Sequence, residues 1–245
     1  MRKILILCIL VASMFANEKK LLIPLYSHPN LWNDKEELFE KMKEKDIDVY
    51  AIINPHNGPG EVAQEDYANG IRLLKLYDIK VIGYVYTQYG KRDHFLVKED
   101  IYHWSNFYQQ IGVDGIFFDE TASDAKVLPY YEDLTSYARS LDFNFLILNP
   151  GYTTNIEYIN SKIADVIVTY ENSMEAWNNS FPKVINKETE NTKLSLLLHT
   201  LKDNDFEKVL KDEKIKNFSY IYITEDTLAN PWDDISSKLI ETLIK

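Results

Sequence analysis

Short apolar runs recur along the chain and alternate with longer stretches of helical periodicity. Each run is nearly continuous in apolar residues, rather than alternating with polar ones, and this is typical of parallel strands that are covered on both faces. The pattern therefore predicts strands in eight places. They are residues 21–27, 49–55, 81–87, 115–120, 145–151, 166–171, 194–200 and 220–225.

Between and after these runs, apolar residues fall at helical spacing. In the segment 34–45, for example, Leu38, Phe39 and Met42 share one side of a helix. Helices are predicted at 34–45, 67–77, 96–111, 129–141, 155–164, 173–181, 203–214 and 234–244.

The alternation predicts an α/β fold, a single (β/α)8 TIM barrel. A doubly wound open sheet is the alternative, but no G-x-G-x-x-G turn follows any strand, and this disfavours it. No linker or low-complexity run divides the chain of 245 residues.

The first residues have the pattern of an export signal. Arg2 and Lys3 precede the apolar run 4–11, small residues follow, and cleavage is expected near Ala16. We therefore predict a signal peptide at 1–16 and a barrel domain at 17–245. The apolar run is too short to span a bilayer, so we expect a periplasmic or secreted protein with no membrane insertion after signal removal. The single cysteine, Cys8, lies in the signal, so the mature chain would have neither disulfides nor thiolate-bound metal.

Charge narrows the classes of partner. The formal net charge is −11, which argues against nucleic acid or an anionic membrane and fits a neutral or cationic ligand. The 17 tyrosines and 4 tryptophans supply rings for core packing or for stacking against sugars. We expect a monomer.

Polar side chains stand where nearly every predicted strand ends. In a TIM barrel these ends converge on one face, where the active site lies. Asp119 and Glu120 end the fourth strand, and Glu171 ends the sixth. Neighbouring side chains on a strand point to opposite faces, so Asp119 and Glu120 can both face the axis only if the chain bulges or bends. Several carboxylates at one mouth suit glycoside hydrolysis, in which two acids flank the scissile bond.

Other chemistries have little support in the sequence. The histidines lack H-E-x-x-H spacing, and neither a G-x-S-x-G elbow nor a Walker loop is present. We expect no cofactor and no metal.

A set of motifs in barrel order resembles the spherulin-4-like proteins, glycoside hydrolase family 135. The motifs are I-P-L-Y at 23–26, N-P-H-N-G-P-G at 54–60, V-I-G-Y-V-Y-T-Q-Y-G at 81–90, G-V-D-G-I-F-F-D-E at 112–120, L-N-P-G at 148–151 and T-Y-E at 169–171. Beyond residue 171 the resemblance rests on the barrel pattern and on Pro231 and Trp232. It implies an exported barrel enzyme that cleaves α-1,4-linked N-acetylgalactosamine inside a polysaccharide chain. The chain is also similar to endo-α-1,4-polygalactosaminidases, whose substrate is deacetylated and cationic.

The resemblance implies that Asp119, Glu120 and Glu171 are the catalytic residues. We assign Asp119 as nucleophile, Glu171 as general acid/base and Glu120 as a neighbour that binds substrate or tunes a pKa. In a second mechanism the acetamido group of the substrate attacks, Asp119 orients it and Glu120 is the acid. That route needs the acetamido group trans to the leaving group, so an α-1,4 substrate favours the protein nucleophile.

Further residues are candidates for binding the polysaccharide through stacking or hydrogen bonds. They are Tyr26, Tyr84, Tyr89 and Trp232 for stacking, Asn54, Asn57 and Asn149 for hydrogen bonds, Arg92 for an anionic group or a carboxylate, and His28, Tyr170, His199 and Glu225 at the remaining strand ends.

Two other functions stay open at this stage. The barrel could bind polysaccharide without cleaving it, because folds host both activities. A metal-dependent deacetylase would need His199 and Asp119 close enough to share a metal ion.

Overall fold

The computed structural model describes residues 19–245, so the predicted signal peptide, with Arg2, Lys3 and Cys8, lies outside the described residues. Within this part of the chain, eight parallel strands pair in sequence order, and the eighth pairs with the first to close a barrel. The strands are β1 (Lys20–Leu25), β2 (Val49–Ile53), β3 (Lys80–Tyr86), β4 (Val113–Asp119), β5 (Phe145–Leu148), β6 (Val166–Ser173), β7 (Lys193–His199) and β8 (Tyr220–Ile223).

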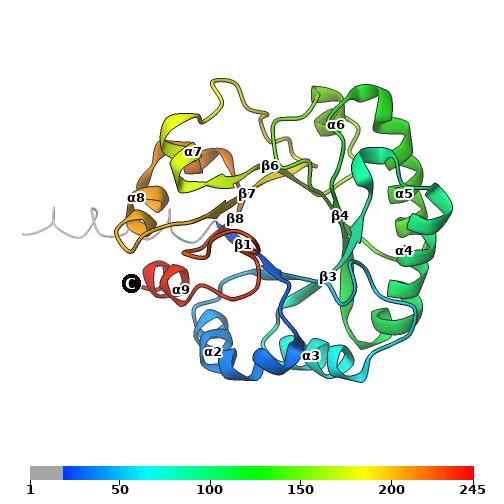
Figure 1. Cartoon of the computed structure of the whole chain (residues 1–245), viewed down its shortest axis with the longest axis horizontal. Helices are drawn as coiled ribbons and strands as arrows, with labels where there is room; N and C mark the ends of the chain where they lie inside the picture. Colours follow the sequence, from blue (N-terminus) through cyan, green and yellow to red (C-terminus); the bar gives the residue numbers. More distant parts are fainter. Residues whose placement is uncertain (1–18) are drawn as a thin grey trace, which may run out of the picture.

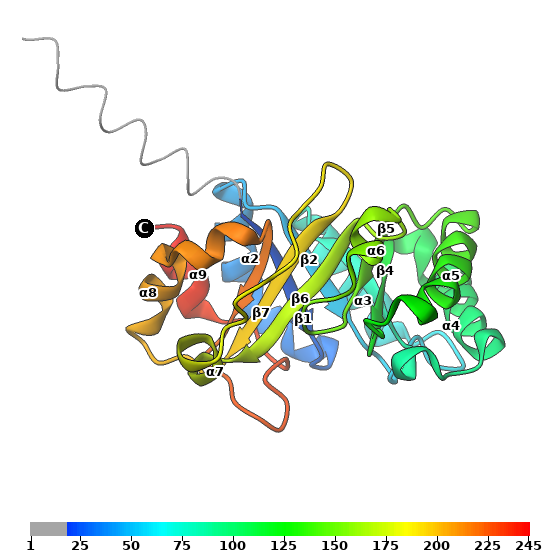
Figure 2. The same ribbon diagram turned by 90° about the horizontal axis from the view of Figure 1, so that it is seen from above.

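The α-helices surround the strands (Figure 1), and the strands slant across the barrel when it is turned by 90° (Figure 2). The helices are α2 (Glu36–Glu44), α3 (Glu65–Leu76), α4 (His94–Tyr108), α5 (Leu128–Ser140), α6 (Ile156–Asn160), α7 (Met174–Asn179), α8 (Asp205–Lys211) and α9 (Ser237–Leu243). Short 3₁₀ helices lie at Pro29–Leu31, Asn33–Lys35, Gln88–Gly90, Gln109–Ile111, Ala125–Val127 and Glu213–Asn217.

The predicted fold is confirmed, and each predicted strand and helix is present with shifted ends. At 203–214 Asp212 interrupts the predicted helix. Its backbone is extended, and its side chain accepts a hydrogen bond from the backbone of Lys214, so it caps the 3₁₀ turn that follows α8. Within residues 19–245 no helix combines the length and apolarity needed to cross a membrane.

Aromatic rings fill the interior of the barrel. Tyr50 of β2 stacks on Phe145 of β5, with ring centroids 4.7 Å apart, and Tyr84 of β3 stacks on Phe117 of β4 at 6.0 Å. Side chains two residues further along a strand share the same face. The next inward position after Phe117 is therefore Asp119, at the carboxyl end of the barrel.

Gly115 in β4 lies too close to β5 for any side chain. A Cβ atom there would overlap the backbone carbonyl of Phe145, its partner in the strand register. Backbone cannot rotate away as a side chain can, so we expect Gly115→Ala to lower the free energy of unfolding by about 3 kcal/mol. Urea unfolding followed by tryptophan fluorescence measures this, and an unchanged midpoint would contradict the packing described.

Candidate active site

The side-chain amide of Asn149, just after β5, links two carboxylates at the mouth of the barrel. Its Nδ2 donates to Oδ1 of Asp119 at 2.8 Å and to Oε2 of Glu171 at 2.8 Å. The two acceptor oxygens therefore lie no more than twice 2.8 Å, or 5.6 Å, apart. The two N–H bonds of an amide diverge by roughly 120°, so the separation is about 5 Å. Asn149 was predicted to bind sugar; in the structure its amide nitrogen fixes the distance between two acids, and its Oδ1 accepts no hydrogen bond from residues 19–245.

The remaining carboxylate oxygens have donors as well. The hydroxyl of Tyr84 donates to Oδ2 of Asp119 at 2.7 Å, and the indole nitrogen of Trp232 donates to Oε1 of Glu171 at 3.1 Å. Tyr26 packs edge-on against Tyr84, with ring centroids 5.6 Å apart, and its backbone nitrogen donates to the carbonyl of Trp232 at 2.8 Å. The connection that follows β8 is thereby held against β1, and each oxygen of the pair faces a fixed donor.

A bend in the backbone follows Asp119 at Glu120. Glu120 has a left-handed φ of 50°, which a residue with a side chain adopts only at some cost. The hydroxyl of Thr87 donates to the carbonyls of both Asp119 and Glu120 at 2.9 Å. This bend lets Asp119 face the axis while Glu120 leaves the strand toward the partly exposed rim.

An irregularity in β6 determines which side chain of the T-Y-E motif faces inward. The register with β7 shifts between Val168 and Tyr170. Tyr170 points away from the carboxylates and packs against Trp177, with ring centroids 5.6 Å apart. Glu171 then faces inward, where Asn149 reaches it. Tyr170, predicted to bind substrate, is instead buried under α7 and is not brought together with the two acids.

Burial and mutual repulsion shift the pKa values of the pair. Burial, and then the charge of Asp119, raise the pKa of Glu171 to about 7, against the hydrogen bonds from Asn149 and Trp232. Burial also raises the pKa of Asp119, while hydrogen bonds from Tyr84, the backbone of Glu120 and Asn149 oppose the rise. Two interacting acids titrate as a pair. The charge of Asp119 holds the proton on Glu171, so near neutral pH Glu171 is the acid and Asp119 the anion.

Two other predicted binding residues do not face this pair. His28 is exposed, accepts a hydrogen bond from the backbone of Asn30, and lies 3.7 Å from a carboxylate oxygen of Asp66 at the start of α3. Glu225 accepts a hydrogen bond from Ser236 at 2.5 Å, beside the start of α9. The partners of His28 and Glu225 therefore lie beside α3 and α9, and the structure does not bring either side chain together with the two acids.

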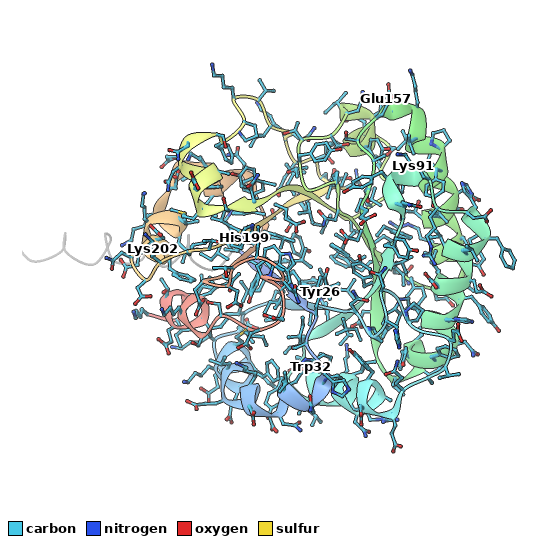
Figure 3. All side chains as sticks on the ribbon, viewed as in Figure 1. Tyr26, Trp32, Lys91, Glu157, His199 and Lys202 are labelled. Atoms are coloured by element: carbon cyan, nitrogen blue, oxygen red, sulfur yellow. The ribbon has the colours of Figure 1, made fainter. Side chains whose placement is uncertain are left out.

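His199 lies near the pair but does not touch Asp119. In Figure 3, His199 and Tyr26 both lie toward the middle of the barrel. Its ring meets Trp232 edge-on at 5.8 Å, and its Nδ1 is 2.8 Å from the hydroxyl of Thr200. Among residues 19–245 no group of three or more His, Cys, Asp or Glu side chains is arranged to hold a metal ion. The geometry does not favour the deacetylase.

The other predicted residues lie around the mouth. Asn54 accepts a hydrogen bond from the backbone of Gly58 at 2.9 Å and so shapes the connection after β2. Asn57 and Arg92 line a cavity together with Tyr86, the register partner of Asp119. Arg92 is not available to an anionic group, because it pairs with Asp100 at 2.5 Å.

Two exposed tyrosines stand at the rim near Glu120. Tyr89 is 49% exposed and its backbone nitrogen donates to the carbonyl of Glu120 at 2.6 Å. Tyr152 is 50% exposed. Burial raises the pKa of Tyr89, and the charges of Glu120 and Asp119 and the hydroxyl of Tyr152 raise it further, so these groups are close. Tyr152 was not predicted, although its signal is present: an aromatic residue follows directly after the N-P-G turn that ends β5.

The sequence and the fold were compared with known proteins. The profile of spherulation-specific family 4 matches residues 20–244. Spherulin-4 of Physarum polycephalum is 26% identical over 216 residues, which cover 84% of this chain and 63% of Spherulin-4. The chain thus spans less than two thirds of the length of that relative.

Solved structures share the barrel. The crystal structure of Aspergillus clavatus Sph3 in complex with GalNAc superimposes with a TM-score of 0.78 at 24% identity, covering 94% of this chain and 98% of Sph3. A putative deoxyribose-phosphate aldolase from Toxoplasma gondii gives a TM-score of 0.50 at 11% identity, covering 96% of this chain and 94% of the aldolase. These likenesses agree with the fold.

Proposed function

We propose that this chain, which belongs to spherulation-specific family 4, is a glycoside hydrolase that cleaves α-1,4-linked N-acetylgalactosamine or galactosamine inside an exopolysaccharide. The observation that carries the proposal is the bridge from the amide of Asn149 to both Asp119 and Glu171. The motifs shared with glycoside hydrolase family 135 support the linkage and the internal cleavage. The sugar named for the Sph3 crystal structure supports a hexosamine substrate.

The separation of the two acids favours a retaining mechanism. Retaining glycosidases place their carboxyl groups about 5–5.5 Å apart, whereas inverting enzymes leave about 6.5–9.5 Å to admit a water molecule. The upper limit of 5.6 Å between the bridged oxygens of Asp119 and Glu171 matches the first class.

The cleavage then proceeds in two steps. The carboxylate of Asp119 attacks the anomeric carbon while Glu171 donates its proton to the leaving glycosidic oxygen. This forms a covalent bond between the sugar and Asp119 and releases one end of the polymer. Glu171, now ionised, takes a proton from a water molecule that attacks the same carbon, and Asp119 leaves. The product keeps the α configuration.

The surroundings of the pair suit these roles. Tyr84 donates to the oxygen of Asp119 that Asn149 does not bind, and so stabilises the anion before attack and after release. Tyr89 and Tyr152 at the rim offer exposed ring faces on which sugar units can stack. The signal peptide predicted at 1–16 supports export, which would bring the enzyme to an exopolysaccharide.

Release of oligosaccharides tests the proposed function. The purified protein is incubated with α-1,4 galactosamine polymers, one fully acetylated and one partly deacetylated, and soluble products are measured by mass spectrometry. We expect a ladder of oligosaccharides from at least one polymer. A folded protein that binds both polymers and releases nothing would instead be a non-catalytic polysaccharide-binding protein.

As pH rises, kcat/KM is expected to fall, with a midpoint near pH 7. Glu171 must be protonated to donate to the leaving group, and its pKa is raised to about 7, so activity is lost as pH rises through that value. A pH–rate profile on the polymer measures this. A rate that stays constant from pH 6 to pH 9 would contradict the assignment of Glu171 as the acid.

Asn149→Ala is expected to move this basic limb to higher pH. The hydrogen bond from Asn149 lowers the pKa of both acids, so its removal raises the pKa of Glu171. We also expect kcat to fall about 10²-fold, because the spacing of the acids is no longer fixed. Asn160→Ala, at the exposed end of α6, is the matched control. If the basic limb of the pH–rate profile stays at its original pH in Asn149→Ala, the amide of Asn149 does not lower the pKa of Glu171.

A further inference from the structure

A cavity of about 860 Å³ lies at the end of β3, and the proposed mechanism does not use it. Three segments line it: the connection between β2 and α3, the end of β3 with the loop that follows, and one side of α4. Its volume lies within the range of about 300–1,000 Å³ that is usual for ligand pockets. We call it the side cavity.

The side cavity adjoins the catalytic pair through Tyr86. Tyr84 and Tyr86 are two residues apart on β3, so both side chains are on the face that carries the Tyr84–Asp119 hydrogen bond. Tyr86 also pairs in register with Asp119. A polymer held at Asp119 therefore needs to extend by only a short distance to reach the side cavity.

The one guanidinium group of the cavity is already neutralised. Arg92 pairs with Asp100 at 2.5 Å, and their side chains are only 14% and 18% exposed. The guanidinium also lies over the ring of Tyr86, 4.2 Å from its centroid, and donates to the carbonyl of Tyr86 at 3.1 Å. This arrangement fixes the wall of the cavity and leaves no free positive charge for an anionic ligand.

Two carboxylates in the lining remain without partners. Glu61, before α3, and Glu99, on α4, are both exposed and both line the cavity. Within residues 19–245 neither accepts a hydrogen bond or forms an ion pair. The other titratable groups of the lining are His56, His103, Tyr86 and the Arg92–Asp100 pair, and Nδ1 of His103 is 3.2 Å from the carbonyl of Gly60. Arg92 is paired with Asp100, so it does not offset the negative charges of Glu61 and Glu99.

We propose that the side cavity is a subsite for a hexosamine unit of the same polymer, away from the cleaved bond, and that it prefers a unit whose amine is free and protonated. This inference rests on the proposed function. An ammonium group has three donors and a positive charge, which suit Glu61 and Glu99, whereas an acetylated amine is neutral. The ring of Tyr86 supplies an apolar surface beside them.

The test compares two polymers of matched length, one fully acetylated and one partly deacetylated. The measured quantity is the ratio of kcat/KM on the deacetylated polymer to kcat/KM on the acetylated polymer. We expect Glu61→Gln/Glu99→Gln to lower this ratio about tenfold, because two partly exposed ion pairs together contribute that much. The preference of the wild type should also weaken in 1 M NaCl, since salt screens exposed charges.

Glu157→Gln/Glu175→Gln is the matched control, because it removes the same charge from α6 and α7, and Glu157 lies at the periphery of the barrel (Figure 3). Its ratio should equal that of the wild type. An equal ratio in the Glu61→Gln/Glu99→Gln variant would overturn the subsite while leaving the proposed function intact.

A binding measurement separates the two proposals if no polymer is cleaved. Galactosamine oligosaccharides are titrated into the wild type and into Glu61→Gln/Glu99→Gln by calorimetry. Weaker binding to the variant supports the subsite even when the hydrolase proposal has failed. Equal binding, or none to either protein, would overturn the subsite.

Discussion

Asp119→Asn is expected to lower kcat on the polymer by about 10⁴-fold, the scale seen when a catalytic side chain of a coupled set is removed. The amide has nearly the same shape as the carboxylate but carries no charge, so it cannot attack the anomeric carbon. Steady-state release of reducing ends measures the loss. Asp114→Asn, at the opposite end of β4, is the matched control. It weakens the contacts of Asp114 with Lys75 and with the backbone of Val81, so it should cost stability but not kcat.

A rescue experiment separates loss of a nucleophile from loss of structure. In Asp119→Ala, sodium azide can enter the space of the carboxylate and attack the sugar from the same side. We expect a glycosyl azide of β configuration to accumulate when the substrate has a good leaving group. Full activity in Asp119→Asn would contradict the assignment outright. An inactive variant with a native thermal transition and no azide product would show that Asp119 has another role.

Glu171→Gln is expected to lower kcat on the polymer by about 10³-fold or more, because the glycosidic oxygen must then leave without a proton. A substrate with a fluoride leaving group needs no such proton, so its first step should be nearly unaffected. The basic limb near pH 7 should also disappear, since the group that titrates there is gone. Stopped-flow release of fluoride and a pH–rate profile measure both effects. Glu175→Gln, exposed on α7, is the control.

Equal losses on polymer and fluoride in Glu171→Gln would contradict this role. That result would mean that Glu171 supports the fold or binds sugar rather than donating the proton. If Glu120→Gln showed the difference between the two substrates instead, the mechanism in which the acetamido group attacks would gain support.

The barrel and the two central acids could be predicted from the sequence because buried strands have a simple residue pattern. Strands covered on both faces are almost continuously apolar, and the first polar residues after each run mark its carboxyl end. Asp119 and Glu171 were found this way. Trp232 was found as an aromatic residue, but its hydrogen bond to Glu171 spans 61 positions of sequence, and no local pattern shows such a contact.

The sequence could not predict how single side chains are oriented at the strand ends. Tyr170 and Glu171 are adjacent, and the register shift before Tyr170 decides which of the two faces the axis. Asn149 was recognised as polar, but its position between two acids depends on how β4, β5 and β6 are staggered. The side cavity was missed because its lining comes from three separate segments, each of which alone resembles an ordinary polar loop or helix face.

Trapping of the covalent intermediate shows whether Asp119 is the nucleophile. A 5-fluoro α-glycosyl fluoride of an N-acetylgalactosamine oligosaccharide reacts in the first step, and its ring fluorine slows the second. Mass spectrometry of the intact protein, followed by peptide mapping, then locates the sugar. We predict one adduct per chain, on the carboxylate of Asp119, and no adduct on Asp119→Asn. Turnover of the polymer with no adduct on the protein, or an adduct on another residue, would contradict the account.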